Sequence, residues 1–238
     1  MIVIIGENLA SATSDMSSSG TVRESRGFLR VPLFVLSLVA FAGFGLDALA
    51  ALGHPVPSWD VGIERAVQQV GWGPLAAAFT AADWFEGLKQ VAAAVVAILL
   101  VAILNRRGFF LMVWGALSGA AYQLIDMLVH RPRPEAALVH VIRHTNGWSF
   151  PSGHAVFFTW IIAYLLLILG RPHLPRPVFI AGWILQGIVL AIIAVGRVYT
   201  GEHWPSDVLA GLLLGAGWTL LGLSIRPLSD PVLEARNA

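Results

Sequence analysis

Two histidines stand beside predicted helix starts, where an imidazole can do acid–base or nucleophilic chemistry. His154 closes the run Pro-Ser-Gly-His, and His203 lies two residues before Pro205. Proline favours the first turn of a helix, so a helix is predicted to begin just after His203. Asp207 then falls in its first turn, where a carboxylate can orient the imidazole and hold its tautomer. The two histidines can therefore supply an acid and a nucleophile.

Basic and small residues near these histidines predict an anion-binding site. Arg133 and Arg197 carry planar, permanently charged guanidinium groups that match phosphate oxygens. Pro151 suits the first turn of a helix, so Ser152 and Gly153 are expected to present backbone N–H groups and one hydroxyl at its positive end. Together these groups predict a cradle for a phosphate-like anion.

The composition narrows both the chemistry and the class of protein. The chain has no cysteine, which excludes disulfides, thiolate nucleophiles and cysteine-ligated metals. The net charge of +1 gives no indication of a nucleic-acid partner. Hydrophobic residues make up 57% and charged residues 12% of the 238 positions, and the mean hydropathy is +0.74. So apolar a chain is expected to be integral in a membrane.

Apolar segments of the required length predict an all-α, polytopic membrane protein. A spanning helix needs about 20 mostly apolar residues. The second segment is expected to extend backwards through Trp84 and Phe85, and the second and fourth are short on apolar count. The six predicted spans are Val31–Leu52, Leu88–Leu104, Phe109–Val129, His154–Gly170, Val178–Tyr199 and Val208–Leu223.

These spans predict a six-transmembrane-helix bundle over residues 30–224. Residues 1–29 are mostly polar and are predicted to be a flexible cytoplasmic tail, and residues 225–238 a short cytoplasmic C-terminal tail. With both termini inside, nine of the fifteen Lys and Arg residues fall on the inner side. The histidine and arginine clusters then meet on the outer face, where ionisable groups near membrane depth are candidates for function.

The segment Pro55–Gly73 between the first two spans has a helical apolar pattern. Apolar residues recur at i, i+3, i+4 and i+7 from Ile63, and most charged residues take the other face. One interpretation is an amphipathic helix in the membrane interface. The alternative is an ordinary loop helix with no function.

The three polar clusters resemble the signature of the type 2 phosphatidic acid phosphatase (PAP2) superfamily, which also contains the vanadium haloperoxidases. That signature is a Lys with Arg-Pro seven residues on, then Pro-Ser-Gly-His, then Ser-Arg with His six residues after the Arg and Asp four residues later. Nine of its eleven positions match in order and spacing, over a resemblance that covers about residues 30–224. The matching positions are Arg133, Pro134, Pro151, Ser152, Gly153, His154, Arg197, His203 and Asp207.

The resemblance implies a reaction and a role for each matched residue. His203 is expected to attack phosphorus and form a phosphohistidine, with Asp207 orienting it. His154 is expected to protonate the leaving alkoxide and then activate water. The phosphoryl oxygens are expected to be bound by Arg133, Arg197, Ser152 and Gly153. The resemblance implies no metal and no other cofactor.

Two positions depart from the signature. Asp126 stands in place of the Lys, and Gly196 in place of the Ser before Arg197. Asp126 opposes phosphate binding unless it pairs with Arg131 or Arg133 or faces away. Lys89, the only lysine, can restore the charge or can simply extend its ammonium to the interface.

Other residues have less specific interpretations. The GxxxG spacing of Gly211 and Gly215 favours close packing within the bundle over a dimer seam. Several tryptophans are predicted to form an aromatic belt at the outer interface. They are Trp59, Trp72, Trp84, Trp148 and Trp204.

The expected substrate is a membrane lipid at the outer face of a plasma membrane, and the brevity and lack of cysteine favour a bacterial one. Undecaprenyl pyrophosphate, phosphatidic acid and phosphatidylglycerol phosphate all fit. One alternative is a family member that binds or transports a lipid phosphate without catalysis, favoured only by Asp126 and Gly196. Another is a vanadate-dependent haloperoxidase, which the membrane topology disfavours. The oligomeric state is left open.

Overall fold

The computed structural model describes residues 27–53 and 56–234, and the predicted N-terminal tail lies almost wholly outside them. The described residues contain helices and no β-strand, with one isolated bridge between Leu29 and Ile225. This confirms the all-α prediction. The elements are α1 (Val31–Gly53), α2 (Ser58–Gln69), α3 (Leu75–Asp83), α4 (Leu88–Leu104), the 3₁₀ turn η1 (Arg106–Gly108), α5 (Phe109–Val129), α6 (Gly153–Leu165), the π-helical turn η2 (Leu166–Gly170), α7 (Arg171–His173), α8 (Arg176–Tyr199), α9 (Pro205–Ser224) and α10 (Arg226–Leu233).

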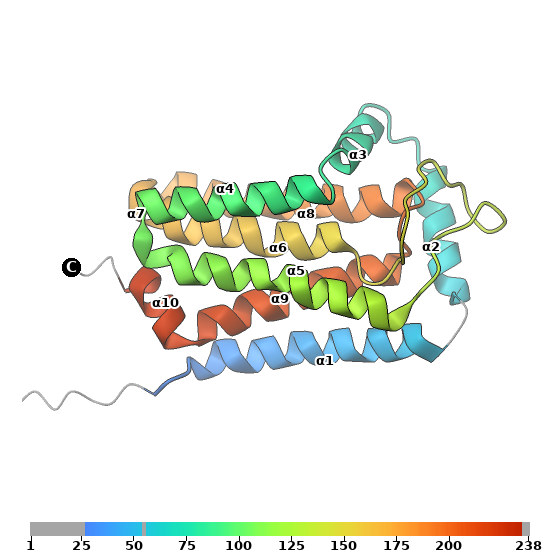
Figure 1. Ribbon diagram of the computed structural model, residues 1–238. Helices are drawn as coiled ribbons and strands as arrows, with labels where there is room; N and C mark the ends of the chain where they lie inside the picture. The colour runs from blue at the N-terminus through green and yellow to red at the C-terminus, as the bar shows by residue number, and fades with distance from the viewer. Residues whose placement is uncertain (1–26, 54–55, 235–238) are drawn as a thin grey trace, which may run out of the picture.

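Long helices lie side by side along one axis, and five segments of the described chain are long and apolar enough to cross a membrane (Figure 1). The chain is therefore a multi-pass membrane protein. Helix α4 lies along the same axis but has only 17 residues, so the count of six spans stays a prediction. The five long segments are Val31–Leu52, Arg106–Val129, Gly153–His173, Arg176–Tyr199 and Pro205–Ser224.

Helix α6 is the central helix of the bundle. It packs against α4, α5, α8 and α9, and Trp160 and Tyr164 on it are almost fully buried. A Cβ on Gly115 of α5 would lie 2.3 Å from the Trp160 ring, so only glycine allows this approach. The α6 segment is therefore held on all sides, which fixes the position of its N-terminal residues.

The GxxxG pair on α9 packs against α6 inside the bundle, as the sequence predicts. A Cβ on Gly211 would lie 2.5 Å from the Ser152 carbonyl oxygen, and one on Gly215 would lie 2.8 Å from the Thr159 Cβ. The two helix backbones approach because neither position carries a side chain. This contact sets the start of α9 beside the start of α6.

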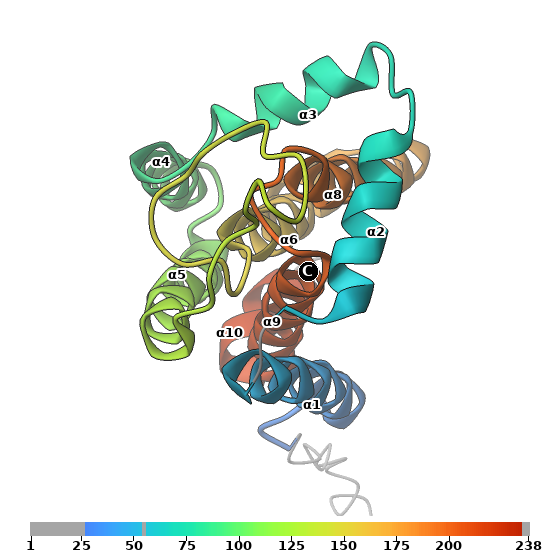
Figure 2. The same ribbon diagram turned by 90° about the vertical axis from the view of Figure 1, so that its right-hand side faces the viewer.

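The connection between α1 and α4 holds two helices rather than one. Helix α2 lies across one end of the bundle, and α3 follows it along α8 (Figure 2). The predicted extension of the second span through Trp84 and Phe85 is wrong. Gly87 has a φ of 56°, which ends the preceding segment, so α4 begins at Leu88.

The charged face of α2 lies in part against the bundle, a feature that neither interpretation of its pattern contained. Asp60 and Glu64 are fully buried, whereas Ile63 and Val70 are exposed. The charged face turns inward because Asp60 finds hydrogen-bond donors there, on Arg131 and Ser206. The placement of α2 in a membrane interface stays a prediction.

The described part of the predicted C-terminal tail contains the short packed helix α10. Val232 of α10 is buried, and Arg30 bonds to Asp230 with an N–O distance of 2.5 Å. Helix α10 therefore closes the end of the bundle opposite α2 (Figure 1).

Candidate active site

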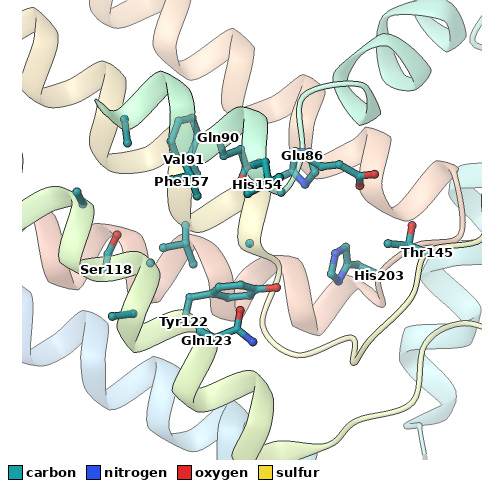
Figure 3. A pocket seen from close by; sticks show the side chains of 18 of the residues that line it. Glu86, Gln90, Val91, Ser118, Tyr122, Gln123, Thr145, His154, Phe157 and His203 are labelled. Carbon is teal, nitrogen blue, oxygen red and sulfur yellow. The ribbon is translucent and has the colours of Figure 1, made fainter. Parts of the chain in front are cut away.

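The predicted site residues meet at the end of the bundle that α2 crosses. A cavity of about 740 Å³ opens there between α4, α5 and α6 (Figure 3). Arg133, Gly153, His154 and His203 line it. Of the other predicted residues, Ser152, Arg197 and Asp207 are fully buried beside the same loops.

His203 is held in one tautomer. Its Nδ1 lies 2.7 Å from the Ser149 carbonyl oxygen, which can only accept, so Nδ1 carries the proton. Nε2 is then the basic nitrogen, and the Arg133 Nη1 lies 3.4 Å from it. Burial, followed by the positive charges of Arg133 and Arg197, holds the pKa of His203 well below its ordinary value. The ring is therefore neutral near pH 7, as a nucleophile must be.

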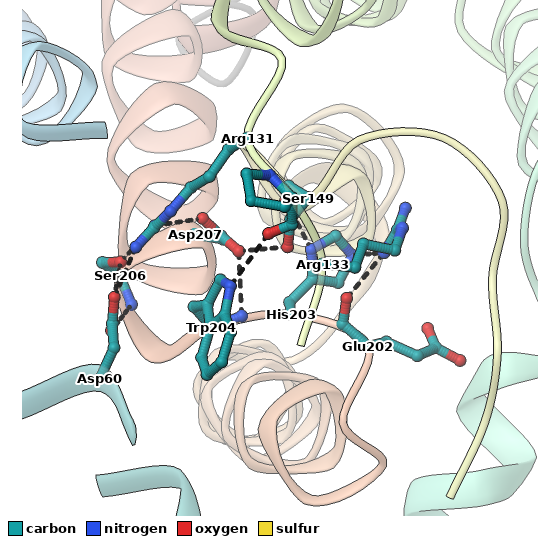
Figure 4. A network of polar contacts seen from close by, with 10 residues as sticks. Asp60, Arg131, Arg133, Ser149, Glu202, His203, Trp204, Ser206 and Asp207 are labelled. Carbon is teal, nitrogen blue, oxygen red and sulfur yellow. Dashed lines mark hydrogen bonds and ion pairs between the residues drawn. The ribbon is translucent and has the colours of Figure 1, made fainter. Parts of the chain in front are cut away.

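Asp207 does not take the position beside His203 that the sequence predicts. Its Oδ2 accepts from the Ser149 hydroxyl at 2.5 Å and from the Trp204 backbone N–H at 2.9 Å (Figure 4). As the third residue of α9, Asp207 folds back onto the residue that caps the helix, which brings it to Ser149. Asp207 thus reaches His203 through Ser149, whose backbone holds the ring and whose side chain holds the carboxylate.

His154 lies in the first turn of α6 and faces the same cavity as His203 (Figure 3). Within the part of the chain that the structure describes, its Nε2 is buried and has no hydrogen-bond partner. The Ser152 hydroxyl is likewise buried without one. The first backbone N–H groups of a helix lack partners in the helix itself. The start of α6 therefore collects unsatisfied groups where an anion is predicted to bind.

Arg133 is fixed by the loop that carries His203. Its Nη1 donates to the Glu202 carbonyl oxygen at 2.7 Å, and its Nε donates to the Gly147 carbonyl oxygen at 3.2 Å. These bonds set the guanidinium beside the imidazole before any ligand binds. Such preorganisation is what stabilises charge that develops during a reaction.

Glu202 is a site residue that the sequence analysis did not find. Its carboxylate lies 2.5 Å from the Arg197 Nη1 and 3.2 Å from the Arg143 Nε, and Arg143 continues to Glu86 at 2.5 Å. Burial raises the pKa of Glu202, although Arg197 and Arg143 oppose this. A row of alternating charges thus runs from Arg197 to the cavity mouth. The sequence feature that could have identified Glu202 is its position directly before His203.

The two departures from the signature have different surroundings. Asp126 is buried on α5 but is not among the residues that line the cavity, and Arg131 pairs with Asp60 and Asp207 instead. Gly196 faces α3, where a Cβ would lie 3.2 Å from the Phe79 Cβ. Close packing of α3 on α8 therefore disfavours a side chain at position 196.

The structure also places Lys89 and Trp204, two residues with predicted interfacial positions. Lys89 donates to the Trp84 carbonyl oxygen at 2.5 Å and lies over the Trp84 ring, outside the cavity lining. Lys89 is therefore not placed to restore the charge inside the cavity, and its position at an interface stays a prediction. Trp204 is fully buried, and its indole Nε1 donates to the Pro132 carbonyl oxygen at 3.0 Å. The prediction that Trp204 belongs to an aromatic belt at the interface is therefore wrong.

The fold and the site define a multi-pass helical membrane protein with a histidine and arginine cavity at one end of the bundle. The family model of the PAP2 superfamily matches residues 90–229. That is more than half of the 238 residues, so the chain belongs to the PAP2 superfamily, as the signature predicted.

Individual relatives are phosphatases by name. An undecaprenyl-diphosphatase of Sulfolobus acidocaldarius is 38% identical over 80 residues, which cover 34% of each chain. A phosphatidylglycerophosphatase B of Bacillus subtilis is 34% identical over 95 residues, covering 37% of this chain and 42% of that one. The aligned segments thus span less than half of the length of these relatives.

A solved structure shares the fold. The crystal structure of a transmembrane PAP2-type phosphatidylglycerolphosphate phosphatase from Bacillus subtilis superposes with a TM-score of 0.65 and covers 78% of this chain and 92% of that one. The identity is 21%, so the likeness concerns the arrangement of the helices.

Proposed function

We propose that the chain is a membrane phosphatase that cleaves a lipid phosphate or lipid diphosphate through a phosphohistidine formed on His203. The observation that carries this proposal is the His203 ring. Its Nδ1 donates a hydrogen bond to the Ser149 carbonyl oxygen, and the ring lines a cavity together with Arg133 and His154. A neutral imidazole whose Nε2 carries the lone pair, with only the long 3.4 Å contact from Arg133 Nη1 on it, suits attack on phosphorus.

The proposed reaction has two displacements. In the first, His203 Nε2 bonds to phosphorus, the bond from phosphorus to the leaving oxygen breaks, and His154 gives that oxygen a proton. In the second, His154 takes a proton from water, the water oxygen bonds to phosphorus, and the phosphorus–nitrogen bond breaks to release inorganic phosphate. Arg133, Arg197 and the start of α6 stabilise the charge on the phosphoryl oxygens.

The shape of the cavity favours a lipid substrate. Below the histidines most of its lining is apolar, with Gln90 and Ser118 as polar exceptions, and it follows α4 from Leu88 to Ala94 and α6 from His154 to Trp160. Six residues of helix rise about 9 Å, which brings the lining into the apolar part of the bundle. A phosphate at the histidines can thus be joined to a chain in the bilayer. The class includes undecaprenyl pyrophosphate, phosphatidic acid and phosphatidylglycerol phosphate.

The test is phosphate release by detergent-purified protein from a panel of these lipids, with EDTA present. Release in EDTA is expected, because the proposed steps use only side chains of this chain. Loss of activity in EDTA, restored by a divalent metal, would contradict the mechanism. No release from any lipid by well-folded protein would favour a binding protein instead. Under the predicted topology, with both termini inside, the activity should face outward.

Gly119→Phe should separate lipid substrates from small soluble ones. Gly119 lines the cavity, and a Cβ there would have no atom within 4 Å, so a larger side chain grows into the space meant for the lipid. We expect lipid hydrolysis to fall at least about tenfold, with p-nitrophenyl phosphate hydrolysis within about twofold of wild type. Gly45→Phe on α1 is the matched control, because it also faces open space but does not line the cavity. An equal loss on both substrates would place the effect outside a chain-binding cavity.

Glu202→Gln should remove a pH dependence of substrate binding. A phosphate on Arg197 lies beside the Glu202 carboxylate, so it binds best when that carboxyl is protonated. Because burial holds the Glu202 pKa above its ordinary 4.5 and a bound anion raises it further, the Michaelis constant should rise with pH.

The measurement is the Michaelis constant between about pH 5 and 8 for wild type and variant. Glu202→Gln is expected to give a flatter profile and a value about tenfold lower at the alkaline end, the effect of one pKa unit. Glu135→Gln, an exposed carboxyl in the loop between α5 and α6, controls for net charge. If the Michaelis constants of wild type, Glu202→Gln and Glu135→Gln changed with pH in the same way, protonation of Glu202 would not be linked to substrate binding.

A further inference from the structure

Helix α2 contributes a fully buried carboxylate to the end of the bundle where His203 lies. Asp60 Oδ2 accepts from the Arg131 Nη2 at 2.7 Å and from the Ser206 hydroxyl at 2.6 Å, and Oδ1 accepts from the Ser206 backbone N–H at 2.9 Å. Asp60 and Arg131 are 0% and 3% exposed. Both oxygens of the carboxylate are thus satisfied, as a buried charge requires.

The contacts of Asp60 continue without a break to the His203 ring (Figure 4). Arg131, which Asp60 holds by Nη2, donates from Nη1 to Asp207 Oδ1 at 2.5 Å. Asp207 Oδ2 accepts from the Ser149 hydroxyl, and the Ser149 carbonyl accepts the His203 Nδ1 proton. Asp60 also accepts from the second residue of α9, the helix that begins just after His203.

Arg131 lies between the two carboxylates, and its Nη1 also donates to the Ser206 hydroxyl at 2.6 Å. A buried guanidinium with one partner missing would be drawn wholly toward the other, and Asp207 would be pulled from Ser149. Asp60 therefore balances Arg131, and the balance leaves the second Asp207 oxygen for Ser149 and Trp204. The arrangement is an orienting chain of side chains behind the reacting group.

We propose that Asp60 is a positioning residue for His203, acting through Arg131, Asp207 and Ser149. It lies outside residues 90–229, which carry the family signature, so this chain draws part of its site from the preceding α2. The proposal rests on the phosphatase function proposed above. It assigns α2 a role in catalysis that neither interpretation of its amphipathic pattern contained.

Asp60→Asn is the main test, because asparagine keeps the size but removes the charge that balances Arg131. We expect the turnover number to fall roughly 10- to 100-fold, as for other groups that orient an active-site ligand. The Michaelis constant should stay within about threefold, since Arg133 and Arg197 bind the phosphate without Asp60. The rate of phosphoenzyme formation in a single turnover, per folded molecule, should fall as much as the turnover number.

Glu64→Gln is the matched control on the same helix. Glu64 is fully buried, and no hydrogen-bond partner for its carboxyl oxygens is found among residues 27–53 and 56–234. Burial, then the charges of Asp60 and Asp207, raises its pKa to about 8, so it is protonated at pH 7. Glutamine is then close to isosteric and isoelectric with it, and turnover should stay within about twofold.

The double variant Asp60→Asn/Arg131→Met separates positioning from a general effect on folding. If both residues act along one chain of contacts, the double variant should be no slower than the slower single variant. The proposal would be overturned if the fold-losses of the two single variants multiplied in the double variant, or if Asp60→Asn left turnover unchanged. So would equal losses of turnover and substrate binding together with a lowered melting temperature. A wild type without activity would instead overturn the proposed function itself.

Discussion

His203→Ala is expected to reduce phosphate release by at least about 10⁴-fold, because it removes the atom that bonds to phosphorus. The loss should appear in the turnover number and for every substrate of the lipid panel, since each passes through the same phosphohistidine. Arg133 and Arg197 remain in place, so inorganic vanadate, which resembles a phosphoryl group in transfer, should still bind.

The measurement compares phosphate release by wild type and variant at equal concentrations of folded protein. His173→Ala is the control, because His173 is exposed at the opposite end of the bundle. Residual turnover above about one per cent of wild type in His203→Ala would mean that another group attacks phosphorus, since loss of a nucleophile costs far more.

Much of the site was predictable because its chemistry is local in sequence. Pro-Ser-Gly-His marks a helix start in four residues, and Pro205 marks another beside His203. Both helices begin there, α6 at Gly153 and α9 at Pro205. The apolar segments likewise predicted the helices of the bundle, with the starts of α8 and α9 within three residues of the expected ones.

The partners of the site residues were not predictable, because they depend on contacts between distant segments. Asp207 lies four residues after His203, yet Ser149, 54 residues away from His203, separates the two side chains. Asp60 meets Ser206 across 146 residues. The periodicity of α2 shows that one of its faces is charged. It does not show whether hydrogen-bond donors lie opposite that face, so the burial of Asp60 could not be predicted from the sequence.

Close packing disfavours the signature serine at position 196. Gly196 is packed against Phe79 of α3, a helix that the apolar pattern did not predict. The Cβ of a serine there would lie 3.2 Å from the Phe79 Cβ and 3.3 Å from its Cα, so Phe79 would have to shift by a few tenths of an ångström to admit it. The site therefore relies on Arg133, Arg197 and the start of α6 for its donors.

His154→Asn is expected to trap the phosphohistidine when the substrate has a good leaving group. A lipid alkoxide leaves only with a proton, so this variant should hydrolyse lipid phosphates about 10²- to 10⁴-fold more slowly. The p-nitrophenolate of p-nitrophenyl phosphate leaves without one, so the first displacement continues. The second displacement still needs His154 to activate water, and phosphoprotein should accumulate.

The trapped species is identified by its chemistry. A phosphorus–nitrogen bond is labile in acid and stable in base, the reverse of a phosphoserine, and intact-protein mass spectrometry should find one phosphoryl group per chain. The double variant His154→Asn/His203→Ala should carry none, because the acceptor nitrogen is gone. Phosphoprotein in the double variant would move the nucleophile elsewhere. Normal turnover of both substrates by His154→Asn would remove His154 from the reaction and leave the cavity with a nucleophile but no acid, which the lipid substrates require.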